Sequence, residues 1–188
     1  MGLTEKIKNH CDNKKVCTIE RKFKKTYLTL RKGYIVDYST EFVLLQEVDD
    51  FLIDGYLIFP LKSIAELRFN NKDRYYDKML RGEKLTEEVG VKYKIDLTSW
   101  QTIFQSLKDL GLNVIIKNED PINDSFDIGP ITEVDSTSVS IQYFNSMGFL
   151  DKEPTKISWN LITIINFDDR YTNTMSKYLR NRKTKKLF

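Results

Sequence analysis

Histidine and cysteine are scarce in this chain, which limits the chemistry it can carry. Among 188 residues there are one histidine, His10, and two cysteines, Cys11 and Cys17. These three ligands with that spacing do not fit a structural zinc site, and two cysteines are too few for a disulfide framework. We therefore expect no metal centre, a reducing cytoplasmic location, Cys11 facing the core and His10 on the surface of a helix.

Long hydrophobic runs and catalytic motifs are missing as well. No apolar segment approaches the roughly 20 residues that a membrane helix requires, and the N-terminal stretch MGLTEKIKNH is not a secretory signal. The sequence has no phosphate loop, dinucleotide fingerprint, Gly-x-Ser-x-Gly elbow or His-Glu-x-x-His motif. It therefore predicts a protein that is not an enzyme, needs no cofactor and has no membrane partner.

Basic residues gather at both ends of the chain. Residues 1–33 hold ten Lys and Arg against three acidic residues, residues 180–188 hold five and no acidic side chain, and the middle is acidic overall. Such asymmetry favours nucleic acid or another acidic partner, with a solvated edge and a frayed tail as the alternative. The candidate nucleic-acid contacts in these segments are Lys14, Lys15, Arg21, Lys22, Lys24, Lys25, Arg180, Arg182, Lys183, Lys185 and Lys186.

Aromatic residues are plentiful and allow two interpretations. They could stack on bases, or they could fill a small β core. We expect Phe51, Phe59, Phe104 and Trp159 to be core residues, and Tyr34 and Tyr38 to be exposed and available for stacking.

An internal repeat organises the chain. The segment GYIVDYSTEFVLLQ (33–46) aligns without gaps on GPITEVDSTSVSIQ (129–142), and FPLKSIAELRF (59–69) matches WNLITIINF (159–167) with a small shift. Each copy begins with a helical pattern, weak near Thr4 and strong from Trp100 to Gly111. We expect one domain over residues 1–82 and a second over 92–188 that ends in the basic tail.

Both copies end in Asp-Arg-Tyr, at 73–75 and 169–171. The functional interpretation is a pair of equivalent sites. The structural interpretation is that each aspartate caps a short helix and each tyrosine packs that helix on the barrel. We favour the structural interpretation, because duplication preserves packing residues more readily than two active sites.

Each copy is predicted to hold about five short, bent strands, which bury a core if the sheet curls into a small barrel. Gly33 leaves room for a bend, residues 37–41 make a tight turn, and Asp54-Gly55 is the two-residue signal of a second hairpin. The predicted class is mainly β with helices.

These residues resemble the Sm/LSm family of small β-barrels. Gly33 and Ile35 open a strand, an acidic loop follows at 37–41, and 43–45 resume the next strand, with YLIFPLKSIAEL (56–67) where the last two strands meet. The resemblance implies two tandem five-stranded bent barrels, each preceded by a helix. Tandem SH3-like or OB barrels are the alternative architecture.

The RNA-gripping motifs of that family are not matched. Residues 38–42 read Tyr-Ser-Thr-Glu-Phe where Asp and Met-Asn are usual, and the Arg-Gly between the last two strands is replaced at 60–62 and 160–162. The Tyr-Lys-His signature of the bacterial RNA chaperone of this fold is also absent. Two functions therefore stay open: a non-catalytic module associated with RNA or other nucleic acid, or a scaffold that binds protein through its sheet edges. The oligomeric state is open too.

Overall fold

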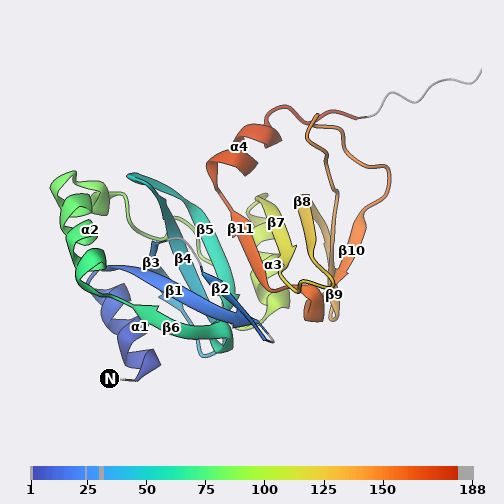
Figure 1. Cartoon of the computed structure of the whole chain (residues 1–188). Helices are drawn as coiled ribbons and strands as arrows, with labels where there is room; N and C mark the ends of the chain where they lie inside the picture. The colour runs from blue at the N-terminus through green and yellow to red at the C-terminus, as the bar shows by residue number, and fades with distance from the viewer. Residues whose placement is uncertain (1, 24, 30–31, 182–188) are drawn as a thin grey trace, which may run out of the picture.

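The computed structural model describes residues 2–23, 25–29 and 32–181, which form a mainly antiparallel β structure with some helices (Figure 1). We call residues 3–82 the first repeat and residues 100–176 the second repeat. The first contains α1 (Leu3–Asp12), β1 (Val16–Phe23), β2 (Thr26–Thr29), β3 (Gly33–Tyr38), β4 (Phe42–Asp49), β5 (Leu52–Pro60), the 3-10 turn η1 (Leu61–Ser63), β6 (Ile64–Arg68) and α2 (Asn71–Gly82). After η2 (Leu85–Glu87), the second contains α3 (Trp100–Asp109), β7 (Asn113–Asn118), β8 (Ser125–Val134), β9 (Ser138–Ile141), β10 (Thr155–Ser158), η3 (Trp159–Leu161), β11 (Ile164–Phe167) and α4 (Arg170–Ser176).

The two repeats have the same strand order and the same register. Strands pair in the order β5-β4-β3-β1-β6 in the first repeat and β10-β9-β8-β7-β11 in the second. Ile35 lies opposite Leu45, and Ile131 lies opposite Ile141, which are the positions that the sequence alignment equates. A register shift follows immediately in both pairs of strands. The equivalence therefore extends to the bulge that bends each strand.

Two equivalent glycines permit this bend. A Cβ atom on Gly33 would lie 2.6 Å from the backbone oxygen of Gln46, and one on Gly129 would lie 2.0 Å from the backbone oxygen of Gln142. Either contact is shorter than van der Waals separation, so a side chain at these positions would force the strands apart. The alignment of 33–46 with 129–142 thus corresponds to a shared steric requirement.

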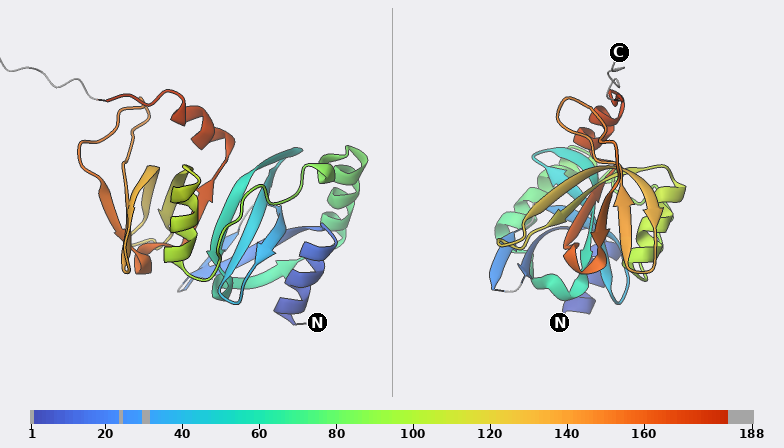
Figure 2. Two further views of the ribbon diagram at one scale, coloured as in Figure 1. Left: turned by 180° about the vertical axis from the view of Figure 1, so that it is seen from behind. Right: turned by 90° about the vertical axis from the view of Figure 1, so that its right-hand side faces the viewer.

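The two repeats join through β5 and β11, which we call the joint. Ile165 of β11 lies opposite Ile58 of β5 and Phe167 lies opposite Tyr56, so one open sheet of 11 strands runs through both repeats. Figure 1 shows β11 beside β5 at the centre of the molecule, and Figure 2 (left) shows α3, in yellow-green, on the side of the second repeat that faces the first. Two closed barrels are therefore not confirmed, because the sheet continues from one repeat into the other and is not closed.

The hydrophobic core also crosses the joint. Tyr56 and Ile58 of the first repeat belong to the same buried cluster as Phe104 and Phe167 of the second. Conversely, Ile164 of the second repeat packs in the main cluster of the first. Each repeat thus completes the core of the other. This explains why Ile58 and Ile165, which lie opposite each other in the joint, are both fully buried.

The outer strands β6 and β10 differ from the joint strands in one respect. Register and turn equivalence place Lys156 of β10 where β5 has Ile58, and Glu66 of β6 where β11 has Ile164. Both charged side chains are on exposed residues. Charges on an edge strand oppose pairing with a further strand, because pairing would bury them. The sequence therefore distinguishes the covered joint from the outer strands β6 and β10.

The second hairpin of the first repeat turns four residues earlier than expected. Strand β4 ends at Asp49 and β5 begins at Leu52, so the turn lies at residues 50–51, with Asp50 in the left-handed region at φ 46°. The expected turn at Asp54-Gly55 is wrong. Gly55 lies inside β5, where a Cβ atom would come within 2.6 Å of the Asp169 backbone. Phe51, expected in the core, is at the tip of the turn and is 47% exposed.

The segment between the repeats packs against the sheet. Its polar start leads into three buried apolar residues, Val89, Ile95 and Leu97. Helix α3 then begins at the predicted cap, where the Ser99 side chain accepts a hydrogen bond from the Thr102 amide. Among the described residues, no helix is both long enough and apolar enough to cross a membrane.

Candidate functional site

A groove of about 400 Å³ lies between the two repeats. The first repeat contributes the end of β1 and the turn after β5, and the second contributes the start of α3 and the turn η3. The lining combines aromatic rings with basic and amide side chains. Its residues are Arg21, Lys22, Phe23, Pro60, Lys62, Ser63, Trp100, Trp159, Asn160, Ile162 and Thr163.

Both tryptophans of the chain line this groove. Phe104 of α3, which is fully buried, lies 5.6 Å from the Trp159 ring in a stacked arrangement and 6.0 Å from the Trp100 ring. Phe42 of the first repeat contacts Trp100 edge-on at 4.6 Å. The two indoles are half-buried, so each has one side fixed by the core and another part open to the groove. Rings held in this way can stack on a planar ligand at little entropic cost.

Arg21 lies at the buried side of the groove, between the two repeats. Its side chain is 1% exposed and donates to the Ser63 hydroxyl (3.0 Å), to Oε2 of Glu119 (2.7 Å) and to the Thr163 carbonyl (2.7 Å). Burial lowers the pKa of the guanidinium, and the Glu119 carboxylate opposes that shift. Arginine still stays protonated at neutral pH. Its charge is paired with Glu119, so Arg21 links the two repeats and is not free to contact a phosphate.

The other basic candidates do not share one surface. Lys22 lines the groove and is exposed, as is Lys25 beyond it. Lys14 donates to the Val89 carbonyl at 2.6 Å, and Lys15 lines a different cavity beside α1. Arg180 donates to the Met147 carbonyl and lies over the Phe149 ring at 4.1 Å. Lys24, Arg182, Lys183, Lys185 and Lys186 lie outside the described residues, as does most of the basic tail.

The tyrosines predicted to be exposed are not both available. Tyr34 is fully buried between the first strand and α2, with Val16, Leu80 and Val89, and burial raises the pKa of its hydroxyl well above the usual range. The expectation of an exposed stacking ring is therefore wrong for Tyr34. Tyr38 is half-buried against the core of the first repeat.

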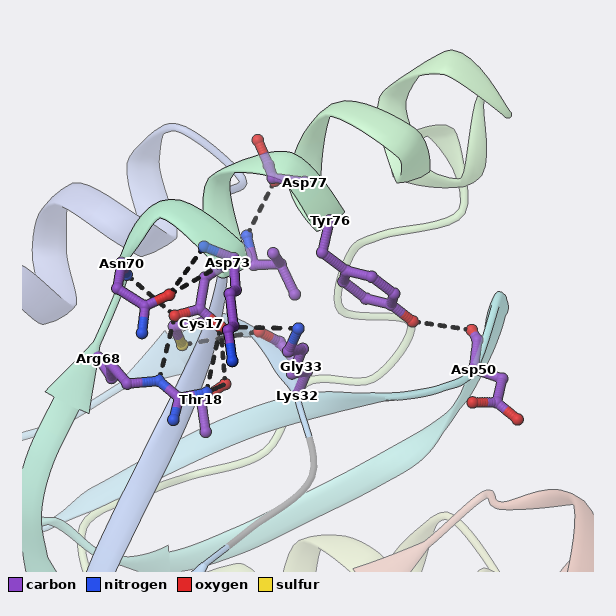
Figure 3. A network of polar contacts seen from close by, with 12 residues as sticks. Cys17, Thr18, Lys32, Gly33, Asp50, Arg68, Asn70, Asp73, Tyr76 and Asp77 are labelled. Atoms are coloured by element: carbon purple, nitrogen blue, oxygen red, sulfur yellow. Dashed lines mark hydrogen bonds and ion pairs between the residues drawn. The ribbon is translucent and has the colours of Figure 1, made fainter.

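Asp73, the aspartate of the first Asp-Arg-Tyr copy, belongs to a buried polar network at the start of α2 (Figure 3). Asp73 is fully buried and accepts from the Asn70 amide (2.9 Å), Thr18 (3.1 Å) and Arg68 (3.2 Å). Burial opposes ionisation of this carboxyl, but these hydrogen bonds outweigh burial and lower its pKa. Lys32 lies 3.6 Å from the same carboxylate. The network ties β1, β6 and α2 together, which is a structural role.

The predicted roles of the motif are only partly correct. Asp169 caps α4, accepting from the Thr172 amide at 2.8 Å, whereas the cap of α2 is Asn70 and Asp73 lies one turn inside that helix. Tyr75 and Tyr171 are 65% and 53% exposed. The prediction that these tyrosines pack the helices on the sheet is therefore wrong.

His10 is buried, which corrects its predicted place on a helix surface. It is 4% exposed, its ring meets Phe69 edge-on at 5.1 Å, and Nδ1 lies 3.0 Å from the Lys15 carbonyl. Cys11 is half-buried and Cys17 is buried. Within the described part of the chain, no cluster of three or more His, Cys, Asp or Glu side chains could hold a metal ion.

Sequence reasoning overlooked the groove because it treated the tryptophans as core residues. Trp100 opens the helical pattern that ends at Gly111, and Trp159 is among the aromatic residues expected in the core. The available signal was the repeat itself: residues 61–63 and 159–161 are equivalent turns, and both turns line the groove.

Comparison with protein-family models, curated proteins and solved structures finds no match for this chain. The groove is therefore interpreted from its own chemistry.

Proposed function

We propose that the protein is a non-catalytic module of two tandem Sm-like repeats that binds single-stranded nucleic acid in the groove between them. A helix followed by bent strands in the same order and register in both halves supports the Sm-like interpretation. The observation that carries the function is the placement of both tryptophans beside two lysines in one groove.

The chemistry of the groove suits a single strand better than a duplex. Bases can stack on the open parts of Trp100 and Trp159, while Lys22 and Lys62 can contact phosphates. A 400 Å³ groove accommodates one or two unpaired bases but not the width of a double helix. Stacking and charge carry little sequence information, so we expect weak binding with little sequence preference.

Intrinsic tryptophan fluorescence tests this proposal directly. Because the chain has only two tryptophans and both line the groove, a quenched or shifted signal reports on this surface. A single-stranded RNA of about ten nucleotides should quench the fluorescence at low salt, and quenching should weaken steeply as salt rises. Fluorescence anisotropy with the same RNA, labelled, measures the affinity and its salt dependence.

Lys62→Glu should weaken the affinity and reduce the slope of log K against log salt by about 0.7, the value of one phosphate contact on a single strand. Lys78→Glu, on the exposed face of α2 away from the groove, makes the same charge change and should preserve quenching. Deleting residues 182–188 should flatten the slope without abolishing quenching, if the tail adds phosphate contacts of its own.

Absence of quenching and of anisotropy change at low salt would refute nucleic-acid binding. The protein-interaction hypothesis would then replace it, with an acidic peptide as the groove's occupant or a protein strand at a sheet edge. Equal losses in the Lys62 and Lys78 variants would show attraction by net charge alone, which would also refute the groove as the site.

A further inference from the structure

A second cavity, of about 460 Å³, lies in the first repeat between α1, the start of β1, the end of β6 and α2. Its lining contains three cationic side chains, one histidine and one amide around two apolar residues, and no carboxylate. The lining residues are Lys6, Asn9, His10, Lys15, Leu67, Phe69 and Arg74.

The acidic groups nearest in sequence are engaged elsewhere. Asp12 pairs with Lys8 at 2.9 Å, and Glu5 accepts from the Gly2 amide. On α2, Asp73 is bound by Arg68, and Asp77 accepts from Arg81 at 2.8 Å and from the Val16 amide. The positive charge of the cavity is therefore not neutralised by carboxylates in its wall.

The polar groups of the cavity are already oriented. The Nδ1 atom of His10 lies 3.0 Å from the Lys15 carbonyl, so Nδ1 carries the proton of the neutral ring and Nε2 is the second nitrogen. The Lys15 ammonium donates to the Asn9 side-chain oxygen at 3.3 Å. Phe69 lies between His10, which meets it edge-on, and the Arg74 guanidinium, 5.9 Å from the ring centroid.

The equivalent position in the second repeat is covered by the joint. Phe69 is equivalent to Phe167, which is fully buried at the joint and stacked on Tyr56 at 5.2 Å. Phe69 is half-buried, because β6 ends the sheet and carries no covering strand among the described residues. The open ring and the surrounding cations are thus specific to this end of the molecule.

We propose that this cavity binds a phosphomonoester, with its dianionic phosphate held by Lys6, Lys15 and Arg74 and its organic part packed on Phe69 and Leu67. Arginine and lysine are the usual phosphate donors in proteins. The cavity is larger than inorganic phosphate requires, which leaves space for the organic part over the apolar residues. A small metabolite and the 5′-phosphate of an oligonucleotide share this chemistry, and the experiment below separates them.

His10 provides the readout. Burial lowers the pKa of its imidazole, the Lys15 cation adds to that effect, and the Lys15 carbonyl, Asp77 and Asp73 oppose it. Lys6 and Arg74 face the same cavity. A bound anion compensates these cations and favours the imidazolium, so ligand binding should raise the His10 pKa. The affinity for an anion whose own charge is constant should therefore increase as pH falls, whereas a phosphomonoester also takes up a proton near about pH 6, which opposes that increase.

The chain has one histidine, so its imidazole proton NMR signals need no assignment. Titration with phenyl phosphate at constant ionic strength should move these signals saturably and raise the His10 pKa. Inorganic phosphate should act more weakly, because it lacks the organic part. Sulfate, which does not titrate in this range, should retain the pH dependence that belongs to His10.

Lys15→Gln and Arg74→Gln should each weaken phenyl phosphate binding by about tenfold, the loss of one charge-assisted contact. Lys8→Gln is the matched control, because Lys8 lies on α1 beside the cavity residues Lys6 and Asn9, is paired with Asp12 and does not itself line the cavity. A 5′-phosphorylated oligonucleotide that moves the His10 signals when its 5′-hydroxyl form does not would identify a nucleic-acid end as the source. Phenyl phosphate binding without that difference would identify a small ligand.

No saturable shift with phenyl phosphate, or an equal loss in the Lys8 variant, would overturn this proposal. Its failure is distinguishable from failure of the groove, because tryptophan fluorescence reports on the groove and the histidine signals report on this cavity.

Discussion

Replacing Arg21 by methionine should strongly destabilise the protein. The substitution keeps much of the side-chain volume but removes the hydrogen bonds to Ser63, Glu119 and Thr163. Breaking one side of a buried ion pair costs about 3–5 kcal/mol, because the remaining charge stays buried without its partner. Glu119 has 20% of its side chain exposed, so we expect the lower end, about 3 kcal/mol. For a chain of this length that corresponds to a fall in Tm of about 6–12 °C.

Thermal and urea unfolding followed by circular dichroism measure this change, and Glu119→Gln provides the second side of a double-mutant cycle. In the Glu119→Gln background, Arg21→Met should cost clearly less, because no unpaired carboxylate is left. Lys8→Met breaks an exposed ion pair with Asp12 and should leave Tm nearly unchanged. The reasoning fails if Arg21→Met costs under about 1 kcal/mol, or if it costs the same in both backgrounds.

Three further predictions follow from the fold. Gly129→Ala should destabilise by about 2 kcal/mol or more in urea unfolding, because its Cβ would lie 2.0 Å from the Gln142 carbonyl. The free energy of unfolding of the wild type should fall as pH decreases from 6.5. The folded His10 pKa lies below its unfolded value, so in this range the unfolded chain binds more protons than the folded one. The His10→Gln variant should lack this dependence when unfolding is measured over a pH series. Combining Lys156→Ile with Glu66→Ile gives the outer strands β10 and β6 the isoleucines that β5 and β11 carry at the joint. Outer strands of two molecules should then pair, and light scattering should detect concentration-dependent self-association.

Each of these has its own control. Gly33→Ala should also destabilise, since its Cβ would lie 2.6 Å from the Gln46 carbonyl, and a neutral effect at both glycines would refute the steric argument. The lowered pKa of Asp73 acts only below its usual value of 3.8, so it does not contribute near pH 6. Either isoleucine alone should self-associate less than the pair, and a double variant with the same mass as wild type would contradict the joint equivalence.

The β class and the repeat were accessible from sequence because they rest on local patterns. The alternation around Val43 and the glycines at 33 and 129 report on one strand and its neighbour, and the register follows them. The prediction of a turn at Asp54-Gly55 is wrong because glycine is required at 55 for another reason: the backbone of Asp169 lies too close for a side chain. A local turn signal and a tertiary close approach look the same in a sequence.

The joint and the groove could not be predicted in the same way. Both depend on which strand pairs with β5. The sequence pattern predicts that Ile58 is a core residue in either case, whether the sheet of one repeat closes into a barrel or pairs with the other repeat. Burial of Tyr34 and Arg21 has the same origin. The polarity of Tyr34 and the charge of Arg21 favour exposure, but Tyr34 packs against Leu80 of α2, and Arg21 bonds to Thr163, just before β11. Pattern reasoning ranks residues by type, whereas these positions are decided by long-range pairing.

The joint also has a consequence during protein synthesis. Ile58 pairs with Ile165, and β11 ends at Phe167, so about a hundred residues separate β5 from the strand that covers it. At about 5–20 residues per second, the ribosome needs roughly 5–20 s to supply that strand. Until then the nascent chain carries a long apolar edge whose backbone groups can pair with any other strand. The interval is long enough for a chaperone to bind, and slow translation between the repeats would lengthen it.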